Sequence, residues 1–95
     1  MRLSNQQHQS IKNTFIKIFK QGEIYLFGSR VDDNKKGGDI DLYIVVPNLK
    51  NLMAKRIEFL VELKREIGNQ KIDIVFDKGE DRLIDRVAKE EGVLL

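Results

Sequence analysis

Hydrophobic residues recur at the spacing of an amphipathic helix in three segments of the chain. The first predicted helix begins at Ser4, where Gln7 completes a capping box, and Gly22 ends it. The second runs from about 49 to 67 and the third from about 81 to 91, and a glycine follows each. The apolar positions that we expect to face the core in the second helix are Leu49, Leu52, Met53, Ile57, Leu60, Val61 and Ile67.

Three other segments concentrate β-branched and aromatic residues. These predicted strands are 23–27, 39–46 and 71–76. One face of the second strand is aliphatic, whereas the other begins with Asp39 and Asp41. The order α-β-β-α-β-α therefore predicts an α+β fold of two layers, in which a small mixed sheet carries helices mainly on one face. For Val93 to Leu95 two interpretations stay open, packing against this domain or contact with a partner.

Composition excludes several classes of protein. The chain has 95 residues, which predicts one domain over 1–95. It has no cysteine, so a disulfide framework, thiolate metal ligands and a cysteine nucleophile are excluded. Its net charge of +2 is too small to predict direct binding of nucleic acid. No apolar run is long enough to span a bilayer and the first residues lack the pattern of a signal peptide, so we expect a cytoplasmic protein without membrane contact.

Three carboxylates are expected to meet on one face of the sheet. Asp39 and Asp41 point to the same side of their strand, about 6.6 Å apart. The helix between the second and third strands predicts that these strands are parallel, and as sheet neighbours they would put Asp73 beside Asp41. Asp77 lies about 13 Å further along, and we exclude it. Such a cluster attracts a hard cation, and paired Mg²⁺ ions held by acidic residues are typical of displacement at phosphorus. The alternative is a set of strand-edge charges that discourages aggregation.

The turn after the first strand supplies a complementary feature. Gly28 and Ser29 follow that strand directly, and no helix separates it from the next one. Strands joined in this way are usually antiparallel neighbours, so we expect the turn beside Asp39 and Asp41. Its backbone N–H groups and the Ser29 hydroxyl predict a nest for the phosphates of a nucleotide. Taken alone, the same two residues are typical of an ordinary turn.

These motifs resemble the Gly-Ser…Asp-x-Asp signature of the DNA-polymerase-β-like nucleotidyltransferase superfamily. The matching segments are Tyr25-Leu26-Phe27-Gly28-Ser29-Arg30, Gly37-Gly38-Asp39-Ile40-Asp41-Leu42 and Lys71-Ile72-Asp73-Ile74-Val75. One departure is Gly38, where members of the family often have serine. By size the chain is similar to the minimal nucleotidyltransferases, which commonly pair, as antitoxins, with a toxin that has a helical HEPN domain.

The resemblance implies a reaction and a role for each site residue. The reaction is transfer of a nucleoside monophosphate from an NTP to a hydroxyl, with release of pyrophosphate. Asp39 and Asp41 would bind two Mg²⁺ ions. Asp73 would bind the catalytic ion and help to deprotonate the acceptor. Gly28 and Ser29 would hold the β- and γ-phosphates.

The function expected from these features is Mg²⁺-dependent transfer of AMP from ATP to a hydroxyl, by resemblance a tyrosine, of a HEPN toxin partner. One alternative is an antitoxin that acts by binding alone, with an idle site. Another is an enzyme that modifies a small molecule or the end of an RNA. Arg30 is a further candidate for nucleotide binding, with a structural ion pair as its alternative. In the loop that follows, we expect solvated lysines or triphosphate contacts at Lys35 and Lys36, and turn residues at Asp32 and Asp33.

Overall fold

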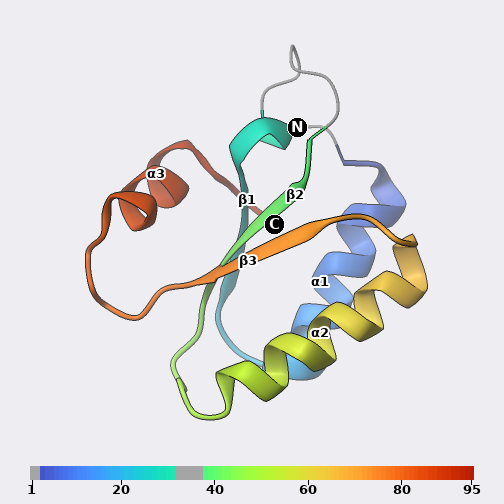
Figure 1. Ribbon diagram of the computed structural model, residues 1–95, viewed down its shortest axis with the longest axis horizontal. Helices are drawn as coiled ribbons and strands as arrows, with labels where there is room; N and C mark the ends of the chain where they lie inside the picture. The colour runs from blue at the N-terminus through green and yellow to red at the C-terminus, as the bar shows by residue number, and fades with distance from the viewer. Residues whose placement is uncertain (1–2, 32–37) are drawn as a thin grey trace.

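The computed structural model describes residues 3–31 and 38–95. Helices and strands alternate along these residues, with one short 3₁₀ helix, as Figure 1 shows. In chain order they are α1 (Asn5–Phe19), β1 (Glu23–Phe27), η1 (Gly28–Val31), β2 (Ile40–Val45), α2 (Leu52–Ile67), β3 (Ile72–Phe76), α3 (Leu83–Glu91) and β4 (Val93–Leu94). The six predicted helices and strands are all present, and the α+β class with a mixed sheet is confirmed.

Helix α1 begins where the sequence predicts, because Ser4 caps it. The Gln7 N–H donates to Ser4 Oγ and the Ser4 N–H donates to Gln7 Oε1, each at 3.0 Å. This capping box satisfies N–H groups that have no acceptor inside the helix. The helix ends at Phe19, and Lys20 follows with a left-handed φ of 70° that turns the chain toward β1.

The strands form one sheet in the order β3-β2-β1-β4. Strands β1 and β2 are antiparallel, whereas β2 and β3 are parallel, as the connections between them predicted. Strand β4 pairs with β1 in the antiparallel direction, and the Leu95 N–H donates to the Ile24 carbonyl at 2.9 Å. The last residues therefore pack against this domain, which is one of the two interpretations that their sequence left open.

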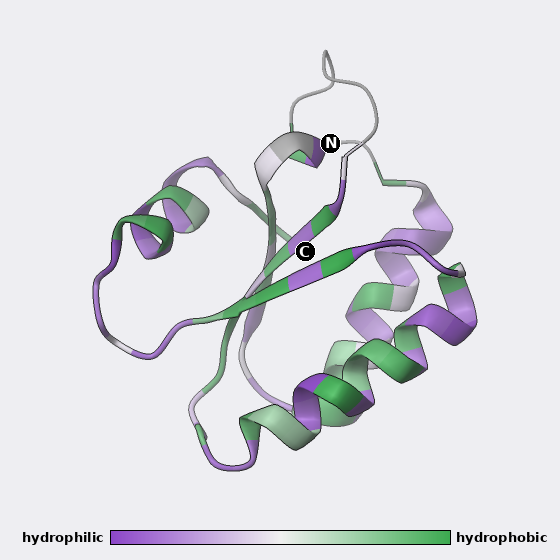
Figure 2. Ribbon diagram, in the orientation of Figure 1, coloured by the Kyte–Doolittle hydropathy of each residue, from purple (hydrophilic) through white to green (hydrophobic). Residues whose placement is uncertain are grey.

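The aliphatic face of the sheet carries α1 and α2. Near the start of β2 and of β3 a hydrophilic position lies between hydrophobic ones, and the rest of β3 is hydrophobic (Figure 2). On the covered face Ile40, Leu42 and Ile44 are fully buried. Phe19 of α1 contacts both Phe59 of α2 and Phe76 of β3, with ring centroids 6.0 and 5.9 Å apart. The two helices and the sheet thus share one hydrophobic core. No helix in the described residues combines the length and apolar character needed to cross a bilayer.

The predicted core face of α2 is right only in part, because Leu52, Leu60 and Ile67 pack against the core whereas other predicted positions do not. Met53, Ile57 and Val61 are 68%, 54% and 47% exposed, whereas Phe59 and Leu63 are fully buried. The apolar residues of this helix cover an arc wide enough to contain two overlapping stripes, so periodicity alone does not select between them. Burial of an aromatic ring removes more apolar area from water than burial of an aliphatic chain, which favours the stripe that contains Phe59.

Helix α3 lies across the sheet from the other two helices, on the mixed face (Figure 1). Tyr43 is fully buried there, and its hydroxyl donates to Oδ1 of Asp85 at 2.7 Å. Arg82 holds the same carboxylate from the start of the helix, with Nη2 to Oδ1 at 3.0 Å. The hydrogen bonds from Arg82 and then Tyr43 hold the pKa of Asp85 well below its usual range. Tyr43 therefore anchors α3.

Candidate active site

Asp41 and Asp73 are direct neighbours across the parallel strands β2 and β3. The register pairs Asp41 with Asp73, with Leu42 against Ile74 one residue on. Neighbouring strands lie about 4.8 Å apart, and side chains of paired residues project from the same face. The sequence-based expectation that these two strands are parallel neighbours with Asp73 beside Asp41 is confirmed.

The two carboxylates interact unfavourably. The pKa of Asp41 is raised, chiefly because partial burial disfavours its charged form. The negative charges of Asp73 and then Asp39 raise it further, and Lys71 opposes them. Asp41 is thus a carboxylate that gains from a proton or a cation placed between it and Asp73.

Asp39 lies just before β2 and is half exposed. Its Oδ2 is 3.4 Å from Nζ of Lys71, the residue that precedes β3. The Ile40 N–H donates to the carbonyl of the same lysine at 3.0 Å, which joins the starting ends of the two strands. Lys71 was not among the predicted site residues. Its position directly before the Asp73 strand is the signal in the sequence that could have identified it.

Gly28 brings backbone against the Asp41 carboxylate. Gly28 directly follows β1, whose last residue Phe27 pairs with Asp41 in the antiparallel register, so Gly28 lies beside Asp41. The glycine has a left-handed φ of 78°, and a Cβ added to it would collide with Oδ2 of Asp41. The turn that continues as η1 therefore approaches the acidic pair as closely as backbone can. The expected proximity of Gly28 to Asp41 is confirmed, and Ser29 follows within the same 3₁₀ turn.

Arg30 connects the turn to the segments that precede β2 and β3. Its Nε donates to the Gly38 carbonyl at 3.3 Å, and its Nη2 donates to Oε1 of Gln70 at 3.2 Å. These bonds hold together the three chain segments that surround the carboxylates. Nucleotide binding by Arg30 stays a prediction.

The donor chemistry fits Mg²⁺. Carboxylate oxygens are the ligands that hard divalent cations prefer, and the mutual repulsion around Asp41 is what such a cation relieves. In the described residues no group of three or more His, Cys, Asp or Glu side chains encloses a metal position. Magnesium usually keeps several waters and binds one or two carboxylates plus substrate phosphates. Asp41 and Asp73 would supply the protein ligands. Asp39 is paired with Lys71 and completes no group of three among the described residues, so metal binding by Asp39 stays a prediction.

Two further groups of residues were considered in the sequence. Asp77 was excluded from the cluster, and in the structure its Oδ2 is 2.8 Å from Nζ of Lys89. The hydrogen bond from Lys89, and then that from the Gly79 N–H, lower the pKa of Asp77. The loop residues Asp32, Asp33, Lys35 and Lys36 lie outside the described part of the chain.

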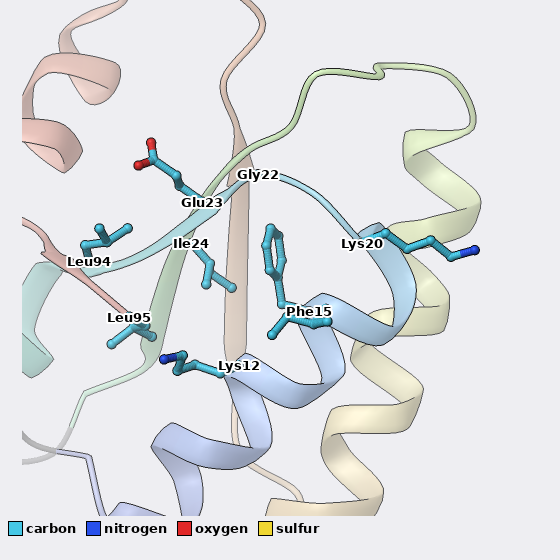
Figure 3. Close-up of a pocket in the computed structure, with 9 residues that line it drawn as sticks. Lys12, Phe15, Lys20, Gly22, Glu23, Ile24, Leu94 and Leu95 are labelled. Carbon is cyan, nitrogen blue, oxygen red and sulfur yellow. The ribbon is translucent and has the colours of Figure 1, made fainter.

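A separate hollow of about 240 Å³ lies between α1, the start of β1 and the last residues (Figure 3). Phe15, Ile24 and Leu95 line it, and Lys12 and Lys20 lie at its rim. None of the candidate site residues contributes to this hollow. The acidic pair is therefore a site on the sheet rather than in that cavity.

Comparison with known families gives one match. The model described as polymerase beta, nucleotidyltransferase matches residues 9–95. That range contains Gly28, Asp39, Asp41 and Asp73. A comparison with curated proteins gives no match.

Proposed function

This chain belongs to the polymerase β nucleotidyltransferase family, and we propose that it transfers AMP from ATP to a hydroxyl of a partner protein with Mg²⁺. Family membership supports nucleotidyl transfer in general. The observation that carries the proposal at this site is the register that pairs Asp41 with Asp73, with Gly28 against the Asp41 carboxylate. Carboxylates beside an open backbone turn suit a reaction at phosphorus.

The proposed reaction exchanges one bond at phosphorus for another. The acceptor hydroxyl oxygen bonds to the α-phosphorus of ATP, the bond from that phosphorus to the oxygen bridging to the β-phosphate breaks, and pyrophosphate leaves. Mg²⁺, when bound, neutralises phosphate charge during this exchange. Asp73, the exposed member of the pair, accepts the hydroxyl proton. Asp41 and Asp73 would hold the metal with help from Asp39, and the backbone at Gly28 and Ser29 would hold the outer phosphates.

We propose a HEPN-domain toxin as the partner, so that this chain is an antitoxin that adds AMP to a tyrosine of the toxin. What supports this part is the resemblance of the motifs to those of minimal nucleotidyltransferases.

The test uses ATP labelled at the α-phosphate, Mg²⁺ and the protein that copurifies with this chain or is encoded beside it. We expect label on that protein and an increase in its intact mass by AMP groups. Asp73→Asn should lower the transfer rate by about 100-fold or more, because it removes the proton acceptor. Asp77→Asn is the matched control, because Asp77 directly follows the same strand and has the parity of Asp73, and it should keep transfer. Label transfer that is the same in the wild type and in Asp41→Asn would rule the proposal out.

A further inference from the structure

Strand β3 forms one edge of the sheet, and part of its backbone faces away from β2 (Figure 1). The Lys71 carbonyl and the Asp77 N–H bond to β2, at 3.0 and 2.9 Å. In a parallel ladder the odd-numbered residues from 71 to 77 therefore direct their N–H and C=O groups toward β2. The backbone groups of Ile72, Ile74 and Phe76 point outward. Such an edge can pair with another extended chain.

A groove of about 320 Å³ lies beside this outer edge. Leu52 and Met53, at the start of α2, line it together with residues 74–76 of β3. At the far end Arg82 Nη2 donates to the Phe76 carbonyl at 2.8 Å. The outward backbone groups of Ile74, the outward N–H of Phe76 and an apolar surface thus face the same space, which suits an extended peptide better than a compact ligand.

The charged side chains that line the groove are all positive. Of the described residues that line it, Arg56, Lys78 and Arg82 are cationic and none carries a carboxylate. Arg82 is paired with Asp85, whereas Arg56 and Lys78 form no ion pair with any residue that the structure describes. An occupant with acidic residues at this end would supply the missing negative charge.

We propose that the acceptor protein binds here as an added strand. An extended segment pairs with the free edge of β3 so that its hydroxyl residue lies opposite Asp73, its apolar side chains face α2, and acidic residues lie near Arg56 and Lys78. The proposal rests on the proposed nucleotidyl transfer and names how the acceptor is recognised.

The geometry of strand pairing makes this arrangement specific. The backbone N–H and C=O groups of Asp73 already point toward β2. In an antiparallel added strand, the residue opposite Asp73 therefore forms a non-hydrogen-bonded pair with it, and the two Cβ atoms are about 4.5–5.5 Å apart. The hydroxyl residue then projects on the face of Asp73. The residues before and after it project toward α2 and the groove. The expected acceptor sequence is two acidic residues, an apolar residue, any residue, an apolar residue and then the hydroxyl residue.

The probe is a synthetic acetylated peptide of this pattern, with two glutamates, a valine, a glutamine, a valine and a tyrosine. Without ATP or Mg²⁺, peptide binding should slow amide hydrogen exchange at Ile74 and Phe76, whose N–H groups face outward. Exchange at Val75, whose N–H already bonds to β2, should stay unchanged. Protection at Ile74 and Phe76 without protection at Val75 would not follow if the peptide bound only against α2.

Two matched pairs test the contacts. N-methylation of the valine directly before the tyrosine removes a donor that faces β3 and should weaken binding by about tenfold, whereas N-methylation of the tyrosine should not. Arg56→Glu should weaken binding several-fold, and the same change at Lys64, exposed on α2 outside the groove, should not.

The outcomes separate the two proposals. AMP transfer without protection of Ile74 and Phe76 would overturn the added strand and leave the proposed function standing. Protection without transfer to any protein would overturn the proposed function. A dimer of this chain that occupies the β3 edge and is not displaced by the peptide would also overturn the added strand.

Discussion

Gly28 decides how closely backbone approaches the acidic pair. Its φ of 78° and the space taken by Asp41 Oδ2 leave no room for a side chain. Gly79 has a similar φ of 73°, but no atom of the described residues lies within 4 Å of an added Cβ. Substitution of Gly79 by alanine therefore measures the cost of a left-handed backbone alone, whereas substitution of Gly28 adds the cost of the collision with Asp41.

We predict that Gly79→Ala lowers the free energy of unfolding by about 1 kcal/mol, the cost of a left-handed residue with a Cβ. Gly28→Ala should cost roughly 2–3 kcal/mol, because the collision with Asp41 is added. Urea denaturation measures both values. Equal costs at the two positions would contradict the close approach to Asp41.

The charge on Asp41 makes the metal-free site a source of instability at neutral pH. Burial and the neighbouring carboxylates raise its pKa, so the folded state holds the proton more tightly than the unfolded state does. Stability without metal therefore falls as the pH rises from the ordinary pKa of 3.8 through the raised value. Lower stability of the metal-free protein is expected where carboxylates are placed together for function rather than for stability.

We predict that Asp73→Asn leaves the metal-free protein as stable as the wild type or more so at pH 7, since it removes repulsion from Asp41. It should also lower the pKa of Asp41, which NMR titration of the carboxyl carbon measures. Thermal melts in a chelator compare the stabilities. The matched change Asp77→Asn should destabilise, because that carboxylate is bound to Lys89. Clear destabilisation by Asp73→Asn would mean that this residue has a structural partner.

At the scale of the elements, α2 presents apolar residues on two sides. Phe59 and Leu63 enter the core, while the exposed stripe of Met53, Ile57 and Val61 continues toward the groove at β3 through Met53. The stripe that looked like a core face in the sequence is thus partly a surface feature. Its physical cause is a helix with more apolar positions than one contact face can bury.

We predict that Phe59→Ala lowers the free energy of unfolding by about 3–5 kcal/mol, the cost of removing a buried aromatic ring. Ile57→Ala should change it by no more than about 0.5 kcal/mol, because Ile57 is mostly exposed. Denaturant midpoints on the two variants make the comparison. A larger loss from Ile57→Ala would show that the sequence-based orientation of α2 holds in solution.

At the scale of the whole molecule, the proposed metal binding would be linked to folding. A cation that binds Asp41 and Asp73 binds only the folded chain, since the unfolded chain does not bring β2 and β3 together. Its binding free energy then adds to the stability of the domain.

We predict that Mg²⁺ at ten times its dissociation constant stabilises the wild type by about 1.4 kcal/mol. For a domain of this size, that corresponds to a rise in Tm of roughly 5–10 °C. A chelator should reverse the rise, and Asp41→Asn should abolish it. Sodium chloride at matched ionic strength is the control for screening of the carboxylates. An equal rise in Asp41→Asn would exclude this site as the metal site.

Local sequence determined the elements and much of the candidate site. The alternation in β2 and β3, the capping box at Ser4 and the types of connection between strands are short-range features, and they sufficed to predict that Asp41 lies beside Asp73. The proximity of Gly28 to Asp41 follows from the same connections. These inferences succeed because strand periodicity and connection length constrain the backbone before any packing is considered.

Tertiary structure alone decided three matters. The orientation of α2 depends on which side chains fill the space against Phe19 and Phe76, and that is a competition between packings. The pairing of β4 with β1 and the hydrogen bonds of Arg30 join residues far apart in the chain. The outward backbone of β3 beside a cationic groove exists only once the strand order is set. Long-range contacts of this kind leave no periodic trace in the sequence, because each depends on the position of several elements at once.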